Sequence, residues 1–230
     1  MTLAPLILVP GLGSDEAVWR GVIERLAAVA ACQIAETRLD DSIAAIAARV
    51  LASALPAFAL AGISMGGYVA LEIVRQAPGR VVRLSLFDTN ARPDTPEQSA
   101  GRRAAVAALD KAPMATLSRL SLPQLVADDA SDEVRDAVVA MGVRVGKDAY
   151  ARQQAANIAR SDSRPHLAAI AVPTLIAVGE RDVLTPPVLA EELRDGISGA
   201  RLHVISGSGH LPPIEQPDAV AALLRDWLAG

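Results

Sequence analysis

Short apolar runs alternate with longer stretches of helical periodicity along most of this chain. The runs lie at residues 5–9, 33–37, 57–62, 82–87, 173–178 and 201–206. They are apolar at consecutive positions, so we expect strands that are buried on both faces. Strands that alternate with helices are typical of a parallel sheet covered on both sides. The sequence therefore predicts an α/β fold with a mostly parallel sheet of about six strands flanked by helices.

The alternation stops between Thr89 and Pro165, where helical patterns dominate. Thr95 is a good helix start, because Pro96 follows as the first helical residue and Gln98 can close a capping box. Further helices are expected at residues 114–122, 132–145 and 147–160, with a break at Gly146.

The position of these expected helices within the chain predicts a core and an inserted helical segment. Residues 1–90 and 166–230 would form the core, and residues 91–165 would form a helical lid inserted after a strand. Some apolar side chains of the insertion either line an acyl site or pack the lid helices on one another. They are Leu117, Leu120, Leu122, Leu125, Val138, Val139 and Met141.

The segment Gly62-Ile63-Ser64-Met65-Gly66-Gly67 stands between a predicted strand and a predicted helix that ends near Pro78. A G-x-S-x-G pattern in this context is typical of a sharp turn that presents a nucleophilic serine. Gly62 and Gly66 bracket the serine, because so tight a turn leaves no room for β-carbons. Ser64 is therefore the candidate nucleophile. The alternative is a surface serine in a glycine-rich turn.

An activated serine needs a base, and the chain has three histidines. His210 lies in a glycine-rich segment directly after the predicted strand 201–206, at the strand's carboxyl end, and is the candidate base. His203 lies inside that strand and is expected to be a half-buried structural residue. His166 follows Pro165 and is expected at the surface or in the lid.

A carboxylate should orient the base. Asp182 is the candidate, in a turn that follows the predicted strand 173–178. Its rivals are Glu180 in the same loop and Asp88 at the end of an earlier strand. Each of these carboxylates has the simpler alternative of forming a turn or capping a helix.

The three candidates occur in the order Ser64, Asp182, His210, which is the order of nucleophile, acid and base in serine hydrolases of the α/β-hydrolase fold. The segments GISMGG, GERDVLTPP and GSGHLPPIEQP resemble the nucleophile elbow, acid loop and histidine loop of that superfamily. The chain is most similar to its small bacterial esterases, enol-lactonases and carbon–carbon bond hydrolases. The resemblance covers nearly the whole chain and is weakest between residues 90 and 170.

An oxyanion hole is the fourth element that such chemistry needs. Met65 would supply one backbone N–H, because it follows the nucleophile at the start of a helix. The resemblance of residues 9–14 to the family's His-Gly-x loop assigns the second N–H to Leu12. Pro10 stands where many relatives carry the histidine that braces this loop.

Composition excludes several further classes of function. The formal charge is −4 with no basic cluster, which argues against nucleic acid as a partner. Hydrophobic residues make up 51% of the chain, yet no run approaches the roughly 20 residues of a membrane span. The first nine residues lack the pattern of a signal peptide. The single cysteine, Cys32, excludes an internal disulfide and fits a cytoplasmic protein.

The resemblance implies a cofactor-free serine hydrolase, without a metal, that cleaves a small carboxylic ester, thioester or lactone through an acyl-enzyme. We expect a monomer or a weak homo-oligomer whose partner is a small-molecule acyl substrate. Carbon–carbon bond hydrolysis, perhydrolase activity and acyl transfer stay open, because the same residues do not encode the leaving group. A non-catalytic small-molecule receptor with this fold is the alternative from another class.

Overall fold

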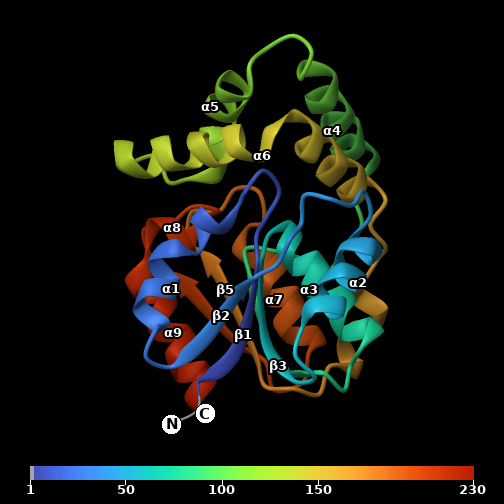
Figure 1. The fold of residues 1–230 in the computed structure, drawn as a ribbon, viewed down its shortest axis with the longest axis vertical. Coiled ribbons are helices and arrows are strands. Elements are labelled where there is room, and N and C mark those ends of the chain that lie inside the picture. Colours follow the sequence, from blue (N-terminus) through green and yellow to red (C-terminus); the bar gives the residue numbers. More distant parts are fainter. Residues whose placement is uncertain (1–2) are drawn as a thin grey trace.

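Six parallel strands form a single sheet in the order β2-β1-β3-β4-β5-β6 (Figure 1). The computed structural model describes residues 3–230. The strands are β1 Ala4–Val9, β2 Ala30–Ile34, β3 Phe58–Ile63, β4 Val81–Phe87, β5 Thr174–Gly179 and β6 Arg201–Ile205. The predicted parallel sheet is confirmed. Strands β2 and β3 lie on opposite sides of β1, so the loops after β1 and β3 diverge and leave a crevice at their carboxyl ends.

Helices cover both faces of the sheet, and β1 shows how the sequence divides between them. Leu6 and Leu8 pack in the apolar core on one face, while Ile7 and Val9 pack in the core on the other. The first face is covered by α1 Arg20–Leu26 and α9 Pro217–Ala229, and the second by α2 Ile43–Ser53, α3 Met65–Gln76 and α7 Pro187–Gly196. Figure 1 shows α1 and α9 on one side of the sheet and α2 and α3 on the other.

The segment between β4 and β5 forms three helices at the end of the molecule opposite the termini (Figure 1). They are α4 Pro96–Ala108, α5 Met114–Leu125 and α6 Asp132–Ile158. The predicted capping box of Thr95 and Gln98 is present at the start of α4. The predicted break at Gly146 is also confirmed, because this residue interrupts α6 with a φ of 76° and a ψ of 168°. The short helices are η1 Glu16–Val18, η2 Arg164–Ala169 and α8 Pro212–Glu215.

The division into a core of residues 1–90 and 166–230 and an insertion of residues 91–165 stays a prediction. The first two residues of that core lie outside the described part of the chain. Within the described residues, every helix is too short or too polar to cross a membrane.

Two sequence expectations fail at the edges of the sheet. A strand was expected at residues 33–37, whereas β2 spans Ala30–Ile34. Residues beyond its end are buried for another reason, since Thr37 is covered by the side chain of Gln153 from α6. His203 was expected to be half-buried but is exposed, because β6 is the other edge strand. The strand expected at residues 201–206 is present as β6, so the two failures concern the bounds of one edge strand and the burial of a residue in the other.

Candidate active site

Ser64 lies on the tight turn between β3 and α3. Its backbone has a φ of 55° and a ψ of −119°. This conformation is strained for any residue other than glycine, and such strained residues cluster at functional sites. A β-carbon on Gly62 would overlap the backbone of Gly66, and a β-carbon on Gly66 would overlap the carbonyl of Val9. The glycines that flank the serine are therefore required by close approach of backbone to backbone.

The end of β4 fixes the turn. The N–H of Ser64 donates to the carbonyl of Phe87 at 3.0 Å, and the hydroxyl of Thr89 donates to the carbonyl of Ser64 at 2.8 Å. Gly67 packs directly against the Thr89 side chain and has no room for a β-carbon. These contacts oppose relaxation of the strained backbone, so the Ser64 side chain is held at the sheet's carboxyl end.

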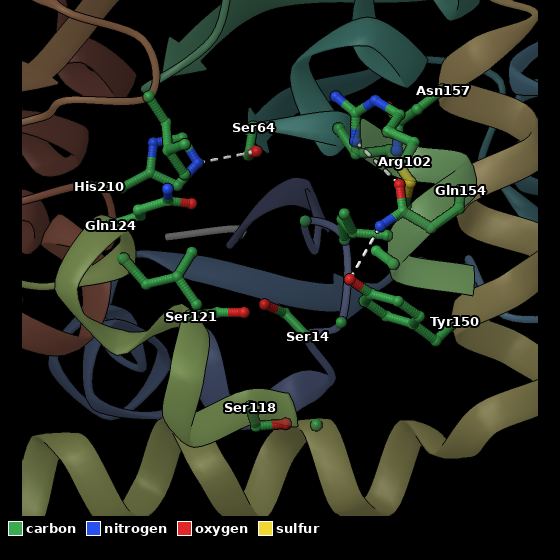
Figure 2. Close-up of a pocket in the computed structure, with 18 of the residues that line it drawn as sticks. Ser14, Ser64, Arg102, Ser118, Ser121, Gln124, Tyr150, Gln154, Asn157 and His210 are labelled. Atoms are coloured by element: carbon green, nitrogen blue, oxygen red, sulfur yellow. Dashed lines mark hydrogen bonds between the residues drawn. The ribbon is translucent and has the colours of Figure 1, made fainter. Parts of the chain in front are cut away.

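The structure brings Ser64, His210 and Asp182 together from three separate loops. His210 Nε2 lies 2.9 Å from Ser64 Oγ, and His210 Nδ1 lies 2.8 Å from Asp182 Oδ2. Figure 2 shows the imidazole directed at the Ser64 hydroxyl. His210 and Asp182 are each only 3% exposed, so their hydrogen bond is shielded from water. This arrangement can transfer a proton from the hydroxyl to the imidazole while the carboxylate holds the ring.

Asp182 is held as a carboxylate by four hydrogen bonds. Its oxygens accept from the backbone N–H groups of Leu184 and Thr185 at 2.8 and 3.0 Å, from the Thr185 hydroxyl at 2.5 Å and from His210. Burial by itself raises the pKa of Asp182, but the hydrogen bond and charge of His210 and the bonds from Thr185 outweigh it and lower the pKa to about 2.

The two rival carboxylates have different surroundings. Glu180 is exposed and accepts a hydrogen bond from the N–H of Gly207. Asp88 is buried beside Asp182 and accepts a bond from the N–H of Gly179 at 2.8 Å. The oxygens of Asp88 and Asp182 and a ring nitrogen of His210 lie within 4.8 Å of one another. This is the set of side chains in residues 3–230 that is close enough to hold a metal ion.

Two backbone N–H groups beside Ser64 have no hydrogen-bond acceptor within residues 3–230. They belong to Leu12 and Met65, and both residues line the cavity in front of the serine. Met65 is the first residue of α3, where the helix dipole favours negative charge. Gly11 packs so closely that a β-carbon there would lie 3.2 Å from Ser64 Cβ, which places the next residue, Leu12, at the edge of the site.

The loop after β1 is braced by α6, which sequence reasoning missed. Gln153 is fully buried, and its Oε1 accepts the N–H of Gly13 at 2.9 Å. Asp15 in the same loop forms an ion pair of 2.6 Å with Arg144. These side chains therefore support the loop. The sequence carries no signal for this contact beyond a glutamine in the helix expected at residues 147–160.

Glu215 is a second residue that sequence reasoning did not assign. Its carboxylate accepts the N–H groups of Gly209 and Leu211 on either side of His210, at 3.0 and 3.2 Å, and the N–H of Ala127 at 2.7 Å. It therefore shapes the histidine loop and ties it to the end of α5. The available signal was a glutamate inside the motif that carries the histidine.

A cavity of about 620 Å³ opens in front of Ser64, between the sheet and helices α4 to α6. Figure 2 shows Ser64 between two walls, with His210, Gln124 and Ser121 on one side and a group of polar side chains from α4 and α6 on the other. Four of the apolar residues named from the sequence as candidates for the acyl site line the cavity, namely Leu117, Leu120, Leu125 and Val138. The other three pack into the apolar core, namely Leu122, Val139 and Met141.

Comparison with known proteins places these features in a family. Residues 6–223 match the profile of the alpha/beta hydrolase family. A pimeloyl-[acyl-carrier protein] methyl ester esterase from Neisseria meningitidis serogroup B is 34% identical over 178 residues, which are 74% of this chain and 68% of that protein. The corresponding serogroup A protein is 30% identical over 177 residues and is matched over 56% of its own length.

Solved structures agree over nearly the whole chain. A thermophilic esterase from Thermogutta terrifontis superposes with a TM-score of 0.91 and 28% identity, covering 99% of this chain and 90% of the other. An enol-lactonase from Burkholderia xenovorans LB400 has the same fold, with a TM-score of 0.91, 24% identity and coverage of 100% and 93%. The family profile and the esterase relatives support a hydrolase. With its profile match, its six-stranded parallel sheet and its serine turn, the chain belongs to the alpha/beta hydrolase family.

Proposed function

We propose that the protein is a serine hydrolase that cleaves a small carboxylic ester, thioester or lactone through an acyl-enzyme, without a cofactor. The observation that carries this proposal is the 2.9 Å contact between Ser64 Oγ and His210 Nε2, on a strained turn at the mouth of a cavity. The esterase relatives support the same reaction class.

In the proposed reaction, Ser64 Oγ attacks the substrate carbonyl while His210 Nε2 accepts the hydroxyl proton. The carbonyl π bond opens and its electron pair moves to oxygen. Collapse of this intermediate breaks the bond to the leaving group, which takes the proton from His210. Water then attacks the acyl carbonyl and gives a proton to His210. Collapse of the second intermediate breaks the bond to Ser64 Oγ, which takes that proton back from His210, and the acid is released. Asp182 holds the imidazole so that Nδ1 keeps its proton throughout.

The N–H groups of Leu12 and Met65 would receive the negative charge that develops on the carbonyl oxygen. Such preorganised donors commonly contribute the largest share of the rate enhancement. Their loops are already fixed by neighbours, the first by Gln153 and the second by the helix start of α3. The helices α4 to α6 would act as a lid that limits access of water to the acyl-enzyme.

The cavity supports a small acyl substrate. Its volume of about 620 Å³ lies in the usual range of pockets for small molecules. Leucines of α5 and Val138 of α6 form an apolar part, which suits an acyl chain. A pimeloyl-[acyl-carrier protein] methyl ester esterase is among the relatives. We propose a medium-length acyl group as the substrate class.

A fluorophosphonate probe tests the proposal, because it reacts covalently with activated serines. We expect the wild-type protein to be labelled at Ser64 and to hydrolyse p-nitrophenyl esters or lactones. Ser64→Ala should lose both properties, with turnover reduced on the order of a million-fold. Ser198→Ala, at an exposed position away from the cavity, is the matched control and should behave as wild type. A protein that binds ligands but is neither labelled nor active would be a receptor.

A further inference from the structure

Two arginines line the cavity, although the protein as a whole is acidic. The formal charge of the chain is −4, yet the cavity is lined by Arg102 and Arg160 and, within residues 3–230, by neither aspartate nor glutamate. Charge of one sign in a concave site attracts ligands of the opposite sign. The cavity is therefore suited to bind an anion, although the chain as a whole carries a net negative charge.

One buried carboxylate behind the cavity neutralises only half of this charge. Asp94 is 1% exposed and bridges the two arginines, pairing with Arg102 Nε at 2.7 Å and with Arg160 Nη1. Two guanidinium groups and one carboxylate leave a net charge of +1 at the cavity wall. Arg160 is further held by its stacking on the Tyr68 ring at 4.3 Å, whereas the Arg102 side chain is 21% exposed. Arg102 is thus the cation that a ligand can reach.

The remaining donors of Arg102 are arranged for a ligand. Its Nη1 donates to Gln154 Oε1 at 3.0 Å, and Gln154 Nε2 donates to the Tyr150 hydroxyl oxygen at 2.8 Å. Tyr150 therefore keeps its own O–H free to donate. Arg102 Nη2 has no hydrogen-bond partner in the described part of the chain. Figure 2 shows these three side chains together on the side of Ser64 that faces away from His210.

We propose that Arg102, Gln154 and Tyr150 form a carboxylate subsite, which binds a free carboxylate at the end of the substrate remote from the scissile carbonyl. The substrate would be a half-ester or a lactone that carries an acid. A carboxylate matches the local charge of +1, whereas a phosphate monoester carries nearly two negative charges at pH 7. The inference rests on the proposed function and names the substrate class of the same site.

Pairs of substrates test the subsite in the wild-type protein. Mono-p-nitrophenyl esters of dicarboxylic acids with four to seven carbons are compared with p-nitrophenyl esters of the same length that end in a methyl group. We expect a kcat/KM that is at least about tenfold higher for one or more of the acids, since a charge-assisted hydrogen bond discriminates by about ten- to a hundredfold. Equal or lower values for every acid would overturn the subsite.

Variants then assign the effect to Arg102. Arg102→Gln should lower kcat/KM for the acid ester about ten- to a hundredfold and change that for the methyl-ended ester less than threefold. Arg102→Lys should recover part of the loss, because it restores the charge without the planar fork. Arg103→Gln, the exposed neighbour on α4, is the matched control and should leave both substrates unchanged. Equal losses for both substrates would mean that Arg102 only ties α4 to α6.

Inhibition keeps the inference testable if the Arg102 variants do not fold. Adipamic acid, with a carboxylate at one end and an amide at the other, is compared with hexanamide as an inhibitor of methyl-ended ester hydrolysis by the wild type. The acid should inhibit at least about tenfold more strongly, and equal inhibition would overturn the subsite. Absence of any Ser64-dependent hydrolysis would instead refute the proposed function, so the two failures are distinguishable.

Discussion

The carboxyl groups of Asp88 and Asp182 lie beside each other in the interior, within 4.8 Å, and their pKa values are shifted in opposite directions. Burial raises the pKa of Asp88 well above its usual range, and the charge of Asp182 raises it further. The pKa of Asp182 is lowered to about 2 by His210 and Thr185, against the effect of burial. Two negative charges this close in a buried site repel each other, which favours the protonated form of Asp88 and the carboxylate form of Asp182.

The first prediction concerns which of the two orients the base. Asp182→Asn should lower kcat about a thousandfold or more, because an amide presents the wrong hydrogen-bonding group to His210 Nδ1. Asp88→Asn should cost little, since the amide reproduces the shape and neutrality of the protonated acid and can still accept from Gly179. Steady-state kinetics of both variants check this. If the two effects were reversed, the acid role would pass to Asp88.

The second prediction follows from the raised pKa of Asp88. An unfolded aspartate ionises near pH 4, while burial and the charge of Asp182 raise the pKa of native Asp88, so that the folded protein releases this proton only at higher pH. Its contribution to stability is therefore fully present below about pH 4 and is lost as pH rises toward the native pKa, by up to about 1.4 kcal/mol per pH unit. The Asp88→Asn variant has no titrating group at this position, so its stability should not fall with pH for this reason. In urea titrations, the free energy of unfolding of the variant minus that of wild type should grow from pH 4 to pH 8, and a constant difference would mean that Asp88 is ionised.

The third prediction concerns the acid limb of the rate profile. The pKa of Asp182 is lowered to about 2, so protonation of this carboxylate should not contribute to the loss of activity above that pH, and a single other group, the catalytic base, should account for it. The logarithm of kcat/KM should then fall with a slope of one. The midpoint should not move in Asp88→Asn, because the substitution removes no charge. A shift of the midpoint to lower pH in that variant would show that a negative charge had been lost beside the imidazole.

The sequence was sufficient for the fold because each inner strand is apolar on both faces, as in β3 and β5, where every residue is buried. The sequence-based expectations were wrong for the bounds of β2 and for the burial of His203, which both belong to edge strands with a neighbouring strand on one side only. Ser64, His210 and Asp182 could be named because each follows a strand, and strand ends of a parallel sheet converge. Which carboxylate faces the imidazole depended on how the loops that carry Asp182 and His210 approach each other in the fold, which no local pattern encodes.

The residues that brace the site were least accessible from sequence, because their partners are far away along the chain. Gln153 contacts Gly13, 140 residues earlier, and Glu215 contacts Ala127. Gln153 lies in no short motif, and the histidine motif that contains Glu215 does not indicate its contact with Ala127. The absence of a histidine at Pro10 suggested a weakly supported loop, whereas the structure supplies the support from the insertion.

The last prediction tests that brace. Gln153 Oε1 accepts the N–H of Gly13, one residue beyond Leu12, and its Nε2 donates to Thr37, so this side chain fixes the loop from which the second oxyanion donor would come. Gln153→Ala removes both bonds and leaves a buried N–H unpaired, which should misplace the Leu12 N–H. Because that donor acts on charge that develops in the transition state, kcat should fall about ten- to a hundredfold while KM changes little.

A merely structural role of Gln153 would show a different pattern. The variant would then lose thermal stability, but the fraction that stays folded would keep the wild-type kcat. Gln153→Glu offers a conservative comparison, since its carboxylate can still accept from Gly13 but cannot donate to Thr37. It should retain more activity than Gln153→Ala when kcat is measured per labelled active site with the fluorophosphonate probe. If both variants had wild-type kcat on that basis, the loop after β1 would not depend on α6.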